Sequence, residues 1–127
     1  KGKFSPKFSK NIVHELIGNG KTVTYACIQL AYYMGFKEVY LIGKDHSYNT
    51  YEKAGVSIIS TGREDNHFIK GYYKKGQSWD APDYKSEELA YQLSRKIFEN
   101  NGRIIKDATI KGKLNVFEKI EFKSLFK

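Results

Sequence analysis

A short apolar run, Val39 to Ile42, closely follows a helical pattern, and this pairing constrains the fold more than any other feature of the sequence. The run does not alternate with polar residues, which is typical of a strand buried on both faces in a parallel sheet. We expect the preceding helix, at about 23–34, to turn one continuous apolar stripe toward the core. The stripe consists of residues at helical spacing: Val23, Ala26, Cys27, Leu30, Ala31 and Met34.

The second half of the chain repeats the order of helix and strand. Pro82 and Asp83 precede a helical pattern that ends at Asn101 and Gly102, and an apolar run at 103–109 reads as the next strand. One face of this helix carries Leu89, Ala90, Leu93, Ile97 and Phe98. A strand, a long connection, a helix and a strand form the crossover that makes two strands parallel. The tail at 113–126 alternates weakly and predicts an edge strand or a docked tail.

The sequence therefore predicts the α/β class, with a parallel sheet flanked by helices. The chain has 127 residues, which suits one domain spanning 1–127 but is short of the ~150 residues of a typical full α/β domain. We therefore expect one domain or part of one. Residues 45–82 form an unusually long connection, and such connections are often lids or binding loops.

Composition favours an anionic partner and argues against a membrane protein. The formal net charge is +8, which favours a nucleotide, a phosphate, an acidic glycan or nucleic acid. Nucleic acid is disfavoured because the lysines are spread along the chain and no recognition motif is present. No apolar run approaches the ~18 residues of a membrane span, and the single cysteine, Cys27, fits a reducing compartment as a core thiol. We expect a cytoplasmic protein, and homo-oligomerisation stays open.

Polar and titratable side chains follow the first strand at once. Gly43 permits a turn or the close approach of a ligand, and Asp45 can accept hydrogen bonds from sugar hydroxyls. Tyr48, Tyr51 and Lys44 can donate to phosphate oxygens, and His46 can move a proton near neutral pH. Because ligands of open parallel sheets bind beyond the carboxyl ends of the strands, this stretch is the leading candidate site. The alternative is a polar junction in which Asp45 caps backbone amides.

Two further places could contribute to the same site. In the long connection, His67 lies beside carboxylates that can orient it as a general base, and Lys70 and Tyr72 suit a sugar, a base or a phosphate. For His67 a catalytic role and a structural one stay equally open. Thr22 and Thr24 stand at the expected N-terminus of the first helix, where free amides favour anions. Histidines and cysteine lack metal-site spacing, so we predict neither a metal nor another cofactor.

Several stretches resemble a known bacterial family. "TVTYACIQLAYYMGFKEVYLIGKDH", "EDNHF" and "YYKKGQSWDAPD" are similar to the C-terminal part of the MptE-like family, named after a 6-hydroxymethylpterin diphosphokinase. The pattern of helices and strands is similar, more distantly, to the family 42 glycosyltransferases, which are bacterial lipooligosaccharide sialyltransferases. Both resemblances imply a Rossmann-like nucleotide-binding fold, and the first implies that this chain is the C-terminal portion of a larger family domain.

The resemblance to sialyltransferases implies the leading hypothesis, a metal-independent glycosyltransferase of surface polysaccharide synthesis. Its donor would be a nucleotide sugar, with a CMP-linked sugar as one candidate, and its acceptor a glycan. Tyr48 and Tyr51 would bind the donor phosphate, and His67 or His46 would act as the base. The resemblance to the diphosphokinase implies an alternative, transfer of diphosphate from ATP to a pterin alcohol with Mg²⁺. A noncatalytic module that binds an anionic ligand is a third hypothesis.

Overall fold

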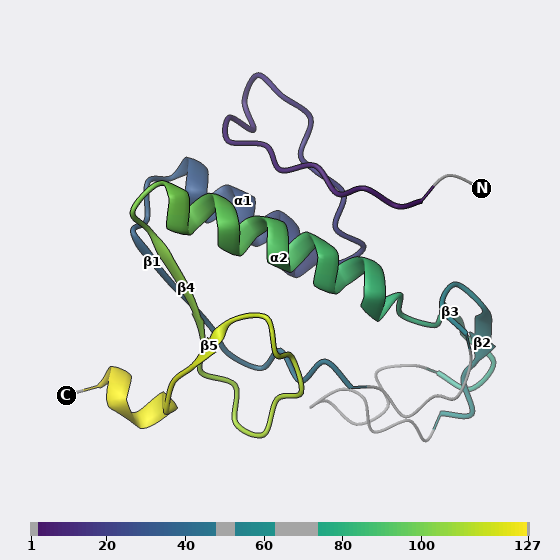
Figure 1. Cartoon of the computed structure of the whole chain (residues 1–127). Coiled ribbons are helices and arrows are strands. Elements are labelled where there is room, and N and C mark those ends of the chain that lie inside the picture. Colours follow the sequence, from purple (N-terminus) through teal and green to yellow (C-terminus); the bar gives the residue numbers. More distant parts are fainter. Residues whose placement is uncertain (1–2, 48–52, 63–73, 127) are drawn as a thin grey trace. The chain divides into compact units, whose positions relative to one another are not determined.

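The computed structural model describes residues 3–47, 53–62 and 74–126 and has a mixed α/β fold (Figure 1). The chain divides into two compact units, residues 1–45 with 85–127, and residues 46–84. Neither helix in the described part of the chain has the length and apolar character needed to cross a membrane. The elements in chain order are α1 (Val23–Tyr33), β1 (Glu38–Leu41), β2 (Ser57–Ile59), β3 (Ser78–Asp80), α2 (Tyr84–Asn100), β4 (Ile104–Asp107), β5 (Glu118–Lys119) and the 3₁₀ helix η1 (Phe122–Leu125).

The first unit is built on a three-stranded parallel sheet with the order β1-β4-β5. The register pairs Val39 with Ile105 and Lys106 with Glu118. Strands β1 and β4 are neighbours although α2 lies between them in sequence, so the predicted crossover is confirmed. The tail supplies β5, which confirms the predicted edge strand.

Both helices share one core with a single face of this sheet. Leu41 and Ile105 point into that core, and the rings of Tyr32 in α1 and Phe98 in α2 meet edge to face at a centroid distance of 5.3 Å. The buried cluster consists of Tyr25, Ile28, Tyr32, Leu41, Ala90, Tyr91, Phe98, Ile105, Leu114, Val116 and Phe117. On the opposite face Lys106 Nζ pairs with Glu118 Oε1 at 3.0 Å. The core is therefore one layer of helices on one layer of sheet.

The ends of α1 follow the expected chemistry. Thr22 is the N-cap, and its hydroxyl accepts the Thr24 N–H at 3.3 Å. At the other end Gly35 has a φ of +86°, and the Phe36 N–H donates to the Ala31 carbonyl at 3.2 Å. This left-handed residue and its backbone bond are the Schellman ending that glycine permits.

The predicted core face of α1 is wrong. Its buried residues are Tyr25, Ile28, Gln29 and Tyr32, whereas the stripe that includes Val23, Cys27, Leu30 and Met34 faces solvent. The helix is apolar on nearly all sides, so periodicity alone does not determine which face turns inward. The tyrosine face takes the core because it offers large rings together with hydrogen bonds to the N-terminal segment. Cys27 is consequently an exposed thiol and not a core thiol.

Gln29 ties the N-terminal segment to α1. Its Oε1 accepts the N–H groups of Ser9 at 2.8 Å and Gly18 at 2.7 Å, and its Nε2 donates to the Gly18 carbonyl at 2.9 Å. A Cβ at Gly18 would stand 1.7 Å from the Lys7 carbonyl oxygen, and one at Gly20 would stand 2.3 Å from the Tyr25 ring. Both glycines of the "GNGKT" stretch are therefore required by close packing.

The second unit contains an antiparallel pair, β2 with β3, in which Ile58 lies opposite Trp79. The run Val56 to Ser60 predicts the first of these strands, whereas the second, with a single apolar residue, carries no comparable signal. At the two ends of the unit, the rings of His46 and Tyr84 are in contact, with centroids 4.4 Å apart.

Candidate functional site

Hydrogen bonds hold together the segments that follow β1 and β4. The Lys44 N–H donates to Thr109 Oγ1 at 3.1 Å, and the Lys113 N–H donates to the Asp45 carbonyl at 2.9 Å. These segments lie at the carboxyl ends of two neighbouring parallel strands. Ligands of open parallel sheets bind at such ends, so the position favours a site.

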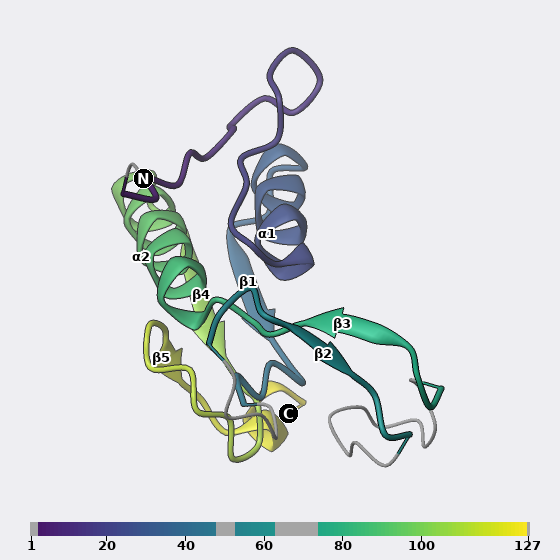
Figure 2. The ribbon, with the colours of Figure 1, turned by 90° about the vertical axis from the view of Figure 1, so that its right-hand side faces the viewer.

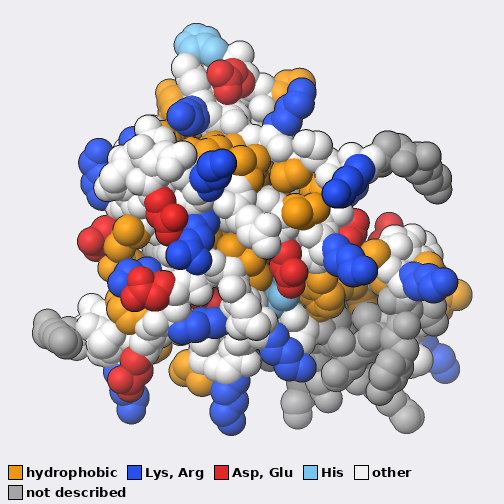
Figure 3. Space-filling view, viewed as in Figure 1, with side chains coloured by type: hydrophobic (Ala, Val, Ile, Leu, Met, Phe, Trp, Pro, Cys, Tyr) orange, Lys and Arg blue, Asp and Glu red, His pale blue; other side chains and the backbone are white. Residues whose placement is uncertain are grey.

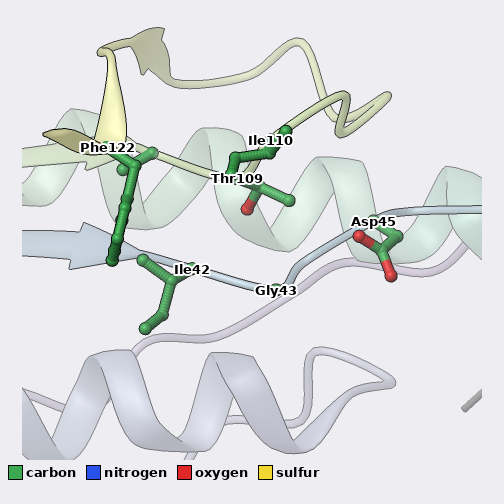
Figure 4. Close-up of a pocket in the computed structure, with 7 residues that line it drawn as sticks. Ile42, Gly43, Asp45, Thr109, Ile110 and Phe122 are labelled. Atoms are coloured by element: carbon green, nitrogen blue, oxygen red, sulfur yellow. The ribbon is translucent and has the colours of Figure 1, made fainter. Parts of the chain in front are cut away.

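A pocket of about 460 Å³ lies between these segments (Figure 4). Its volume falls within the ~300–1,000 Å³ of small-molecule sites. Figure 4 shows Phe122 and Ile42 at one end and Asp45 at the other, with Thr109 and Ile110 between them. The complete lining is Ile42, Gly43, Asp45, Ala108, Thr109, Ile110 and Phe122. The apolar walls suit a flat ring, and the carboxylate with the hydroxyl suits the hydroxyl groups of a sugar.

Gly43 is required by the backbone at the edge of this pocket. Its φ is +68°, in the left-handed region that favours glycine. No atom lies within 4 Å of the position that a Cβ would take, so the space beside it is open. The predicted turn at Gly43 is confirmed, and the open space permits the close approach of a ligand to the backbone.

A buried ion pair anchors the residue between Gly43 and Asp45. Lys44 Nζ lies 2.9 Å from Glu87 Oε2 in α2, with side chains 15% and 6% exposed. The same ammonium lies 5.7 Å from the centre of the Tyr91 ring. Burial raises the pKa of the Tyr91 hydroxyl, and the Lys44 charge together with the hydroxyls of Thr22 and Thr24 offsets part of that rise. Glu87 thus balances the Lys44 charge, and the pair fixes the backbone that forms the rim of the pocket.

A second buried carboxylate orients Thr109. Asp107 has no exposed surface, and its Oδ1 accepts the Thr109 N–H at 2.9 Å. Its Oδ2 lies 2.6 Å from Lys119 Nζ, and that ammonium also donates to the Gly112 carbonyl at 3.2 Å. The Asp107 side chain therefore holds the loop after β4 and the start of the tail in one geometry.

The structure brings together some of the predicted site residues. Gly43 and Asp45 both line the pocket. Thr22 and Thr24 stand at the N-terminus of α1 beside Tyr91, and Thr22 lines a separate hollow of about 510 Å³ formed largely by residues 17–23. Neither threonine lines the pocket that holds Gly43 and Asp45.

The remaining predicted residues belong to the second unit. His46 has a φ of +55° and is largely buried, with its ring packed against Tyr84. The others lie outside the described residues, namely Tyr48, Tyr51, His67, Lys70 and Tyr72. Their proposed roles therefore stay predictions.

The sequence analysis missed five lining residues, Ile42, Ala108, Thr109, Ile110 and Phe122. Thr109 and Ile110 follow β4 just as Gly43 and Asp45 follow β1, so the same rule for parallel strands would have found them. Phe122 arrives from the tail through η1, and nothing in the sequence signals its contact with the pocket.

The side chains that line the pocket suit a small polar ligand with one apolar side. Within residues 3–47, 53–62 and 74–126, no group of three or more His, Cys, Asp and Glu side chains is placed to hold a metal ion. The polar side chains of the lining are Asp45 and Thr109. In comparisons with known proteins, no family model, no curated protein and no solved structure matches this chain.

Proposed function

We propose that the pocket binds the nucleoside part of a nucleotide sugar and that the chain is part of a glycosyltransferase of surface polysaccharide synthesis, with a Rossmann-like fold. The observation that carries the proposal is the position of the pocket at the carboxyl ends of β1 and β4. Nucleotides bind at the corresponding edge of many parallel sheets.

The lining suggests how such a ligand would lie. Ile110 and Phe122 offer an apolar wall for a base, and the Asp45 carboxylate can accept hydrogen bonds from ribose hydroxyls. Lys111 and Lys113 follow in the same loop and add positive charge for a phosphate. Tyr48 and Tyr51 would bind the donor phosphate, and His67 or His46 would act as the base.

The surface charge favours a small anion over a nucleic acid. Figure 3 shows Lys and Arg side chains scattered among acidic ones over the face in view. A nucleic-acid site usually requires a basic stripe or patch that follows the phosphate backbone. A pocket that binds one anionic group does not require such a stripe or patch.

The test is calorimetric titration of the whole chain with CMP, CMP-sialic acid, UDP, GDP and ATP, each with Mg²⁺ and with EDTA. We expect one nucleotide to bind with EDTA present, and the base that it carries identifies the donor. Binding of ATP that requires Mg²⁺ would favour the diphosphate-transfer alternative instead. No binding by any of these nucleotides would reject the proposal for this chain.

Matched variants locate the binding to the pocket. Phe122→Ala removes a ring that lines the pocket. Phe126→Ala removes a neighbouring ring, which contacts the Phe122 ring but does not line the pocket. We expect Phe122→Ala to weaken binding about tenfold, the value of one aromatic contact of ~1.4 kcal/mol, and Phe126→Ala to leave it unchanged. Asp45→Asn should weaken binding by a similar factor because it removes a charge-assisted hydrogen bond. Equal affinities for all three variants would place the ligand elsewhere.

A further inference from the structure

Helix α1 presents an unpartnered apolar face, the outer stripe, made of Val23, Ala26, Cys27, Leu30, Ala31 and Met34. Val23 is 77% exposed, Met34 is 61% exposed and Leu30 is 44% exposed. The stripe contains no charged residue. A helix that is apolar on nearly all sides is normally buried on more than one side, so this face favours a contact with a partner.

Strand β1 has an unpaired edge in the described part of the chain. Its other edge pairs with β4, where the Ile104 N–H donates to the Lys37 carbonyl and the Ala108 N–H to the Leu41 carbonyl. Since backbone groups alternate in direction along a strand, those of residues 38, 40 and 42 point away from β4. An edge of this kind is a template for pairing with another strand.

The outer stripe and the free edge both lie away from α2 and β4. The buried face of α1 meets α2 through the Tyr32 and Phe98 rings, and β4 occupies the paired edge of β1. Figure 2 shows α2 and β4 together on one side of α1 and β1. A single partner that supplies one strand and one apolar helix can therefore cover both surfaces.

We propose that this partner is a second copy of the chain, related by a two-fold axis. Such an interface requires a surface that is complementary to itself. In antiparallel contact of the two copies of α1, the outer stripe meets this condition: Val23 faces Met34 of the second copy, Ala26 faces Ala31, and Cys27 faces Leu30. Large or medium residues are matched along the stripe, and the alanines meet each other, which lets the helices approach closely.

The free edge obeys the same symmetry. With the two-fold axis at Tyr40, an antiparallel pair of β1 strands places residue 38 opposite residue 42 of the second copy. The outward backbone groups of residues 38, 40 and 42 then exchange hydrogen bonds in pairs. The Glu38 side chains lie at opposite ends of the paired strands and do not meet. The two sheets join into one continuous sheet with four helices on one face.

The first test is the mass of the whole chain by light scattering and sedimentation over a concentration series. We expect twice the mass of a single chain of 14.7 kDa. A mass that stays at one chain throughout the series overturns the proposal.

Two substitutions on the outer stripe and one matched control locate the interface. Leu30→Glu should give a monomer, because it places a charge in the centre of the contact. Leu89→Glu changes the same residue type at a similar exposure, 40%, on α2 and should leave the dimer intact. Met34→Lys should also give a monomer, and it does not threaten folding because cations are favoured in the last turn of a helix. A dimer that persists in Leu30→Glu or Met34→Lys, or that dissociates in Leu89→Glu, overturns the assignment of the surface.

A disulfide test checks the register. In a Cys27→Ser background, Val23→Cys and Met34→Cys together should form disulfides between chains on mild oxidation. Within one helix these positions lie ~16 Å apart and cannot be bridged. Val23→Cys with Leu89→Cys is the control, and no crosslinking is expected. Monomeric product from the first variant, or equal crosslinking of both variants, refutes the antiparallel contact.

Discussion

Replacing Gln29 by Leu should destabilise the chain strongly, because Gln29 links α1 to the N-terminal segment through three buried hydrogen bonds. The change removes the acceptor of two buried N–H groups, Ser9 and Gly18, and the donor to the Gly18 carbonyl. A buried polar group left without a partner costs about 1–3 kcal/mol. Three such groups at the low end of that range give a loss of about 3 kcal/mol in the free energy of unfolding.

The assay is urea unfolding followed by circular dichroism, together with thermal melting. For a chain of this size, about 3 kcal/mol corresponds to a fall in Tm of roughly 12 °C. Gln92→Leu, the same change at an exposed position in α2, is the control and should stay within about 0.5 kcal/mol of the wild type.

Amide hydrogen exchange gives a local check on the same reasoning. The Ser9 and Gly18 amides should exchange slowly in the wild type and rapidly in Gln29→Leu, even where both proteins are folded. A Gln29→Leu protein within about 1 kcal/mol of the wild type, with both amides still protected, would refute the assignment of this side chain as the link.

Three further predictions concern the core and the rim of the pocket. Burial raises the pKa of Tyr25 from 10.0 to about 12, so the folded state holds this proton more tightly than the unfolded state. Stability contributed by the neutral hydroxyl is fully present below pH 10 and falls by ~1.4 kcal/mol per unit between pH 10 and 12. The alkaline loss should therefore be smaller in Tyr25→Phe, and parallel stability curves of the two proteins would contradict this. Gly20→Ala should cost about 1–3 kcal/mol in urea unfolding because its Cβ would meet the Tyr25 ring at 2.3 Å, and an unchanged Tm would be inconsistent with that contact. Lys44→Met should cost about 3 kcal/mol because it leaves the Glu87 carboxylate buried without its ion pair, and adding Glu87→Met should restore part of the loss. Additive losses in that double-mutant cycle would mean that the two side chains act independently.

The order of helices and strands in the first unit could be predicted from the sequence, whereas the direction of one helix face could not. Helical spacing located α1 to within a residue at each end, and the apolar run after it located β1. Helical spacing predicted the outer stripe as the core face, whereas in the structure that stripe faces solvent. Two opposite apolar faces satisfy the same periodicity, and the choice depends on partners far away in sequence, such as the Ser9 amide that meets Gln29.

The candidate site was predictable only where a local rule applies. Gly43 and Asp45 follow a buried parallel strand, and that rule placed them at the pocket. The Lys44 and Glu87 ion pair and the Phe122 wall depend on how α2 and the tail pack, and spacing along the chain carries no information on either. Contacts that packing creates between residues far apart in the sequence can be identified only once the fold is known.

The contact between His46 and Tyr84 has a consequence for how the chain can vary. These two residues stand at the two ends of the connection between β1 and α2, so this connection begins and ends at neighbouring points. The entropic free-energy cost of closing such a loop rises by only about 0.6 kcal/mol for each doubling of its length. This connection can therefore lengthen, shorten or be exchanged at little thermodynamic cost to the parallel sheet, and the segment between His46 and Tyr84 is where insertions and new binding specificities can be introduced.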